Sequence, residues 1–158
     1  MKSLYESILG STNAGKAGLI RAWLDENDIK NYTINSKGEV DVNGDVILDY
    51  KNLTEFPSFI QFGTVKGYFN CSFNNLTSLR GCPRVVKKSF YCHDNNLVSL
   101  EGSPEEVWFG FLCQSNNLKD LKGAPKKVGG DFYCDSNSTQ FTEDDVNKVC
   151  RVKKDIYV

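Results

Sequence analysis

The chain has 158 residues, of which 40% are hydrophobic and 25% charged, and its net charge is −1. This size fits a single domain, and a near-neutral charge provides no overall field that would favour nucleic acid or a membrane surface. No apolar run reaches the roughly 18 residues of a membrane span, and none is flanked like a secretory signal peptide, so we expect a soluble, cytoplasmic protein.

The first 45 residues predict an N-terminal cap. Two short helices are expected within residues 1–31, each with one apolar face: Leu4, Ile8 and Leu9 in the first, and Leu19, Ile20, Trp23 and Leu24 in the second. Short strands are expected from Tyr32 to Leu48, separated by turns at Lys37–Gly38 and Asn43–Gly44.

A phosphate-loop spacing, G-x-x-x-x-G-K, runs from Gly10 to Lys16. The next residue is Ala17, so the hydroxyl that would hold magnesium is missing, and the preceding segment has a helical pattern where a phosphate loop follows a strand. Small residues connecting two helices explain the segment more simply. Weak nucleotide binding therefore stays an alternative, and no cofactor is expected.

From Phe69 to Asn137 the chain repeats every 21 residues, and equivalent positions of successive repeats form columns. The first three columns hold Phe69, Phe90, Phe111 and Phe132; Cys71, Cys92, Cys113 and Cys134; and Asn74, Asn95, Asn116 and Asn137. Two leucine columns, a glycine, a proline and a valine complete the unit. A constant period of this length predicts a stacked solenoid, in which each unit buries its apolar face against its neighbours.

The unit F-x-C-x-x-N-x-L resembles the leucine-rich-repeat pattern L-x-L-x-x-N-x-L over roughly residues 46–137. It is most similar to short Cys- and Asn-rich repeats of uncharacterised proteins from gut bacteria and their phages. The resemblance implies a parallel β-solenoid with one short strand per coil. We expect four regular strands and, from Val46 to Val65, one imperfect coil before them.

Within each strand the alternation predicts that Phe and Cys point inward. The column asparagine is expected to turn the chain and satisfy backbone groups, with stacked asparagines bonding one another. Gly and Pro form the outer turn. A column of cysteines spread over several strands cannot converge on a zinc ion, and parallel inward side chains suit a disulfide poorly. The six cysteines are therefore expected to be reduced core residues.

Residues 138–158 predict a C-terminal cap. Thr142 is a suitable N-cap for a helix running to about Cys150, and Ile156–Val158 can form a last strand. The predicted fold is thus an α+β solenoid: a leucine-rich-repeat-like parallel β-solenoid with an N-terminal helical cap and a C-terminal cap of a helix and a strand, in one domain.

Charges concentrate in the repeats, where residues 66–128 hold nine Lys or Arg against five acids. Arg84, Glu105 and Lys126 share a column, and Glu106 shares the next with Lys127, so we expect them to pair between coils. The remaining lysines form a weak basic patch, which makes nucleic acid a less favoured partner.

The residues that carry the function of a solenoid are those that differ from one repeat to the next. Outward positions beside the Phe and Cys columns carry aromatic and polar side chains, and Trp108–Phe109 interrupts a pair of columns that holds Lys87–Lys88 and Gly129–Gly130 in the neighbouring coils. Exposed aromatic strips are typical of partner sites. The candidate binding residues are Tyr68, Asn70, Tyr91, His93, Trp108, Leu112, Gln114, Tyr133 and Asp135.

His93 is the only histidine, and no nucleophile is clearly placed beside it, so we expect no enzyme. The sequence predicts a protein-binding module, monomeric or weakly homo-oligomeric, with no membrane partner. By analogy with the phage and prophage repeats it resembles, a host-interaction or counter-defence role is expected. A structural, self-assembling or virion-associated component and a weak nucleotide or nucleic-acid binder remain alternatives.

Overall fold

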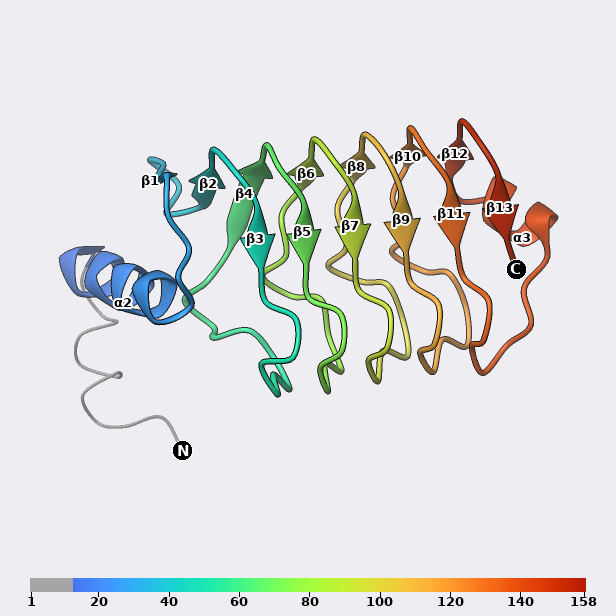
Figure 1. Cartoon of the computed structure of the whole chain (residues 1–158), viewed down its shortest axis with the longest axis horizontal. Helices are drawn as coiled ribbons and strands as arrows, with labels where there is room; N and C mark the ends of the chain where they lie inside the picture. Colours follow the sequence, from blue (N-terminus) through green and yellow to red (C-terminus); the bar gives the residue numbers. More distant parts are fainter. Residues whose placement is uncertain (1–12) are drawn as a thin grey trace.

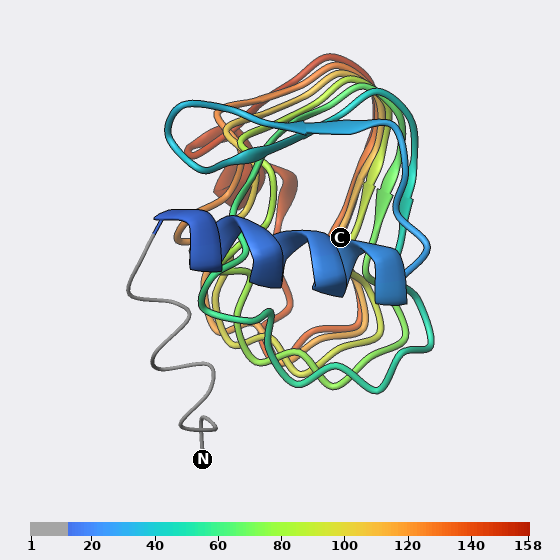
Figure 2. The ribbon, with the colours of Figure 1, turned by 90° about the vertical axis from the view of Figure 1, so that its left-hand side faces the viewer.

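The computed structural model describes residues 13–158 and contains a parallel β-solenoid of about six turns (Figure 1). Helix α2 (Asn13–Glu26) lies across its N-terminal end (Figure 2). Ile20 and Leu24 are buried and Trp23 packs edge-on against Phe56 and Phe62, which confirms the apolar face of this helix. The expected first helix lies outside the described residues, as do Gly10 to Thr12.

Gly15, Lys16 and Ala17 lie inside α2 and not in a connection between two helices, so that expectation was wrong. The hairpin predicted after the helix is present: β1 (Tyr32–Ile34) pairs antiparallel with β2 (Val40–Val42). Its turn contains Gly38, whose φ of 78° favours glycine.

Each coil contributes two short strands, not the single strand expected, and the two sets form separate sheets. Sheet A has the order β1-β2-β4-β6-β8-β10-β12, with β4 (Phe62–Val65), β6 (Val85–Val86), β8 (Glu106–Val107), β10 (Lys127–Val128) and β12 (Arg151–Val152). Sheet B has the order β13-β11-β9-β7-β5-β3, with β3 (Val46–Ile47), β5 (Phe69–Asn70), β7 (Phe90–Tyr91), β9 (Phe111–Leu112), β11 (Phe132–Tyr133) and β13 (Ile156–Tyr157).

The parallel ladders continue past both ends of residues 46–137. Strand β2 joins β4 in sheet A, and β12 and β13 add a last strand to each sheet. Sheet B therefore has six strands: the four regular ones, the imperfect one and the last strand of the C-terminal cap that were expected. The terminal coils lack the Phe-Cys-Asn signature but keep the backbone hydrogen bonds between coils, which do not depend on side-chain identity.

The core is a column of stacked rings. Phe90 is fully buried and lies between Phe69 and Phe111, with ring centroids 5.5 and 5.6 Å apart and interplanar angles of 10° and 7°. The stacking follows from the in-register parallel pairing, which places identical side chains at the strand spacing of about 4.8 Å. This confirms the prediction that the Phe side chains point inward.

The column asparagines tie each coil to the preceding one through backbone groups. Asn95 Oδ1 accepts the Leu76 N–H at 2.9 Å, and its Nδ2 donates to the carbonyls of Cys71 and Cys92 at 3.0 and 3.2 Å. Asn116 repeats this pattern one coil further on. The asparagines therefore satisfy buried backbone, as predicted, but among the described residues they do not bond one another.

The outer turn depends on glycine. Gly102 has a φ of 90°, and a β-carbon there would lie 2.7 Å from the Leu79 backbone of the preceding coil. This close approach of backbones explains why the column holds glycine.

The C-terminal cap is built around α3 (Glu143–Asn147). Thr142 is its N-cap: its Oγ1 accepts the Asp145 N–H at 3.2 Å, while Asp145 Oδ2 accepts the Thr142 N–H at 3.0 Å. The N-cap and the final strand at Ile156–Tyr157 are confirmed, but the helix ends at Asn147, three residues before the predicted Cys150.

Two of the expected charge pairs between coils are present. Lys127 lies 3.2 Å from Glu106, and Lys126 lies 3.9 Å from Glu105. Arg84 was expected to join the second pair but bonds Glu39 at 3.1 Å, because the N-terminal hairpin brings this carboxylate beside it.

All six cysteines are buried and unpaired, which confirms them as core residues. The Cys71 thiol donates to the Tyr91 carbonyl at 3.3 Å, and the Cys113 thiol to the Tyr133 carbonyl at 3.2 Å. Burial raises the pKa of Cys134 to about 12 and that of Cys150 to about 11.

The folded protein is expected to resist alkylation of all six thiols near pH 8, and to react fully in denaturant, because the thiolate is the reactive form. The folded pKa values lie above the ordinary 9.0, so the unfolded chain loses these protons first. The free energy of unfolding should therefore keep its full value below about pH 9 and decrease as the pH rises beyond it. Mass spectrometry after iodoacetamide treatment measures the alkylation, and urea unfolding at several pH values measures the change in stability. Rapid native labelling would contradict the burial.

Candidate functional site

The outer side of sheet B forms a surface that we call the strand face. In-register pairing lines up one outward side chain per strand: Ile47, Asn70, Tyr91, Leu112, Tyr133 and Tyr157. Four of these six were predicted, and the structure brings them together in consecutive coils. The stack of Tyr133 on Tyr157, with ring centroids 4.4 Å apart and 4° between planes, extends the strand face to the last coil.

Five rings form a continuous cluster at the N-terminal half of the strand face. Tyr50 stacks on Phe73 with ring centroids 4.6 Å apart, and Phe73 meets the edge of His93 at 5.1 Å. His93 also contacts Tyr91, and Tyr91 contacts Tyr68, at 6.2 and 6.0 Å. Tyr50 is 67% exposed, so the cluster presents a large apolar area to its surroundings. We refer to these five residues as the aromatic cluster.

His93 is held in place on the strand face and is not freely exposed. Its Nδ1 lies 2.7 Å from Asp94 Oδ2, and its side chain is only 15% exposed. Ser72, which occupies the column of His93 in the preceding coil, is buried, and its hydroxyl donates to Asn70 Oδ1 at 2.6 Å. The hydroxyl is thereby engaged with an amide oxygen and not with the imidazole, so this pair gives no support to nucleophilic chemistry.

Gln114 and Asp135 continue the His93 column toward the C-terminal end. Among side chains in the described part of the chain, Gln114 Oε1 is the one buried oxygen or nitrogen without a hydrogen-bond partner. Asp135 is half-buried and accepts a bond from the Ser136 hydroxyl at 3.1 Å.

Trp108 does not lie on the strand face, contrary to its place in the predicted set. It follows β8 in sheet A, and its N–H bonds the Val86 carbonyl of that sheet's preceding coil at 3.0 Å. Trp108 and Phe109 are 47% and 57% exposed, which settles that neither fills the core. Both lie at the bend where sheet A passes into sheet B.

Sequence reasoning missed four contributors to the strand face and its aromatic cluster: Ile47, Tyr50, Phe73 and Tyr157. Ile47 and Tyr157 belong to coils whose repeat signature has decayed. Phe73 has a signal, since it occupies the left-handed corner column, with a φ of 52°, where Asp94, Ser115 and Ser136 follow. An aromatic residue in a column of turn-forming residues is a departure that could have been noticed.

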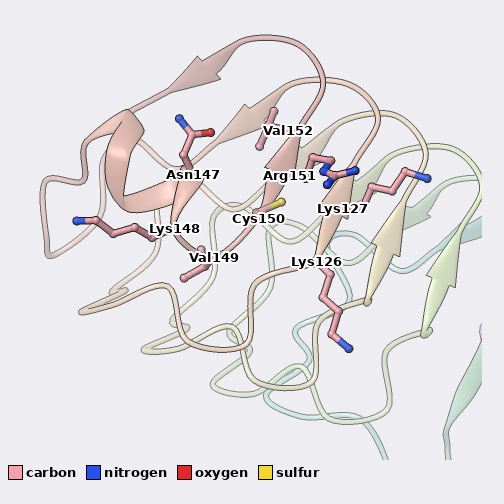
Figure 3. Close-up of a pocket in the computed structure, with 8 residues that line it drawn as sticks. All are labelled: Lys126, Lys127, Asn147, Lys148, Val149, Cys150, Arg151 and Val152. Carbon is pink, nitrogen blue, oxygen red and sulfur yellow. The ribbon is translucent and has the colours of Figure 1, made fainter.

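A shallow hollow of about 590 Å³ at the C-terminal end of sheet A is lined by four basic side chains (Figure 3). Their ends point apart: Lys148 extends away from Lys126, Lys127 and Arg151. Lys126, Lys127 and Lys148 each have a carboxylate within 4 Å. Diverging, partnered cations do not make an anion site.

Over residues 13–158 no cluster of His, Cys, Asp or Glu side chains is arranged to hold a metal ion. The same residues include no helix that is long and apolar enough to cross a membrane. Comparison of the chain with family models, with curated proteins and with solved structures finds no match.

Proposed function

We propose that this chain is a non-enzymatic module that binds another protein through the strand face. The observation that carries the proposal is the aromatic cluster, in which Tyr50, Phe73, His93, Tyr91 and Tyr68 form an unbroken run of ring contacts at the surface. Tyrosine and its aromatic relatives provide most of the binding energy at protein interfaces, and their rings here are already positioned by neighbours in the next coil.

The polar surroundings support the same proposal. Tyr91 lies beside His93, which Asp94 orients, and Gln114 and Asp135 continue this polar column. A partner that covered the tyrosines could also form hydrogen bonds with the half-buried His93 and Asp135. This combination is typical of an interface centre with a polar margin.

Self-assembly through the open C-terminal edge is less favoured. The last coil carries exposed Arg151, Lys153 and Lys154 on and beside β12. Basic side chains on an edge strand oppose pairing with a second copy, since two such edges would bring like charges together. The proposal therefore places the partner on the strand face and not at the end of the solenoid.

The double variant Tyr91→Ala/Tyr133→Ala is expected to abolish partner capture from a lysate of the source cells. Both rings are only half-buried, so the melting temperature should fall by no more than about 4 °C. The matched control is Val98→Ala/Val149→Ala, which removes two exposed apolar side chains outside the strand face and should leave the captured protein unchanged. Equal capture by both variants, or unfolding of the tyrosine variant, would rule out the strand face as described.

A further inference from the structure

A second surface lies along the bends that join sheet A to sheet B, for example between β6 and β7 and between β8 and β9, at the top of Figure 1. Backbone hydrogen bonds keep two columns aligned there. In one, the amides of Lys66, Lys87, Trp108, Gly129 and Lys153 each bond the carbonyl of the preceding coil's valine. In the other, the backbone amides of Phe109, Gly130 and Lys154 donate to the backbone carbonyls of Lys88, Phe109 and Gly130, respectively. We call these two columns the ridge.

The ridge concentrates positive charge that the chain as a whole does not show. Its two columns hold Lys66, Lys87, Lys88, Lys153 and Lys154 and contain no acid. None of these five lysines has an ion pair with any of residues 13–158, whereas Lys126 and Lys127 pair with carboxylates of the preceding coil. Three acids, Asp45, Asp131 and Asp155, flank the ridge on the side of sheet B; Asp45 Oδ1 accepts the Tyr68 N–H, and Asp131 Oδ1 accepts the Asp155 N–H.

Trp108 and Phe109 stand within this row of lysines with one side uncovered. The Lys87 ammonium lies 4.9 Å from the Trp108 ring centroid and covers the side toward the preceding coil. The next coil places Gly129 and Gly130 beside the backbone of Trp108 and Phe109. A β-carbon at Gly129 would overlap the Trp108 carbonyl, and one at Gly130 would lie 2.7 Å from Phe109 backbone, so this coil presents no side chain there.

One coil without side chains, at Gly129 and Gly130, thus separates Trp108 and Phe109 from the next lysines, and we call this interval the notch. On its far side stand Lys153 and Lys154, two coils from Trp108 and Phe109, or about 9.6 Å at the usual strand spacing. Within this solenoid, aromatic rings of adjacent coils stack with centroids 4.4 to 5.6 Å apart. At this spacing there is room for one planar ring between the coil that carries Trp108 and Phe109 and the coil that carries Lys153 and Lys154.

We propose that the ridge binds nucleotide units, with a base stacked on Trp108 and Phe109 over Gly129–Gly130 and its phosphates on the flanking lysines. Planar bases need an open aromatic face, and phosphates need unpaired cations at its sides; the ridge offers both within one row. Single-stranded nucleic acid uses the whole row, because lysines continue for two coils before Trp108 and again after the notch. A free nucleotide would use the notch alone.

An anionic membrane is the less suitable occupant. Lipid headgroups would be attracted by the same lysines, but they have no planar ring to place in the notch. The interleaving of rings with cations along a line is the pattern by which sequence-independent single-strand binders follow a backbone.

The test measures anisotropy of a fluorescein-labelled oligothymidine of about 12 nucleotides, a length in the range of single-strand sites. Binding is expected in the micromolar range at about 50 mM salt, with a logarithmic salt slope of about −2 to −3.5 from three to five lysine–phosphate contacts. Trp108→Ala should weaken binding about tenfold with the slope unchanged, because it removes stacking and no charge.

The charge variant Lys153→Gln/Lys154→Gln should reduce the salt slope by about 1.4, since each lost contact contributes about 0.7. Its control, Lys51→Gln/Lys119→Gln, removes two exposed lysines that lie outside the ridge and should change neither slope nor affinity much. Val98→Ala is the control for Trp108→Ala: it removes an exposed apolar side chain that lies outside both the ridge and the strand face. Thermal unfolding should be unchanged for all four variants.

Competition by adenosine monophosphate separates the two sources of the ligand. If adenosine monophosphate displaces the oligothymidine at a concentration similar to that of the oligothymidine itself, the notch is a nucleotide site. If it does not, binding requires a strand. Both results support the proposal. Absence of oligothymidine binding, equal binding by Trp108→Ala, or sedimentation with phosphatidylserine vesicles in place of oligothymidine binding would overturn it.

Discussion

Replacing Asn95 by alanine is expected to lower the free energy of unfolding by about 3 kcal/mol, because the side chain joins two coils through buried backbone groups. The change leaves the Leu76 N–H without its acceptor and removes the amide donor shared by the carbonyls of Cys71, Cys92 and His93, each of which keeps another partner. One orphaned donor and the lost amide hydrogen bonds add to this estimate. Urea unfolding followed by circular dichroism measures it.

The neighbouring Asn96 provides the matched control. Its side chain is exposed and makes no hydrogen bond among the described residues, although its backbone N–H bonds the Leu76 carbonyl as in the other coils. Asn96→Ala should therefore change stability by no more than about 0.5 kcal/mol. Similar effects of the two substitutions would mean that the buried asparagine column does not hold the coils together.

The inward columns could be predicted because they repeat without interruption. Phe90 and Cys92 alternate with Tyr91, which is the pattern of a strand with one buried face, and both are fully buried. The period also explained Asn95 as a backbone partner. In columns that do not vary from coil to coil, such as these, every repeat supported the same structural interpretation.

The second strand of each coil could not be predicted in the same way. Strands such as β6 have two residues, Val85 and Val86, too few to show alternation. What makes them strands is pairing with the equivalent residues 21 positions away, which depends on how the whole coil closes. Strand β12 was not predicted for the same reason, since its side chains depart from the repeat while its backbone continues it.

The location of Trp108 shows the consequence for the candidate site. Three residues separate it from Leu112 in sequence, and without knowledge of two sheets both were assigned to one face. The bend after β8 places Trp108 at the margin of sheet A and Leu112 on sheet B. Two surfaces thus replace the single predicted one: the strand face with its tyrosines, and the ridge with its lysines.

Replacing Phe90 by alanine is expected to cost about 3 to 5 kcal/mol, the range for a fully buried aromatic ring. Its ring is enclosed between Phe69 and Phe111, so neither backbone can collapse into the space without breaking the strand pairing on both sides. Phe109→Ala is the control of the same residue type: that ring is 57% exposed, and its loss should cost no more than about 0.5 kcal/mol.

Because a coil contacts only its neighbours, a defect at Phe90 should also divide the solenoid into two weakly coupled parts. Trp23 reports on the N-terminal part, since it packs on Phe56 and Phe62, while circular dichroism reports on the whole chain. In a Trp108→Phe background the two signals should share one urea midpoint, and Phe90→Ala should separate them. Coincident transitions in that variant would show that the entire stack unfolds as one cooperative unit despite the defect.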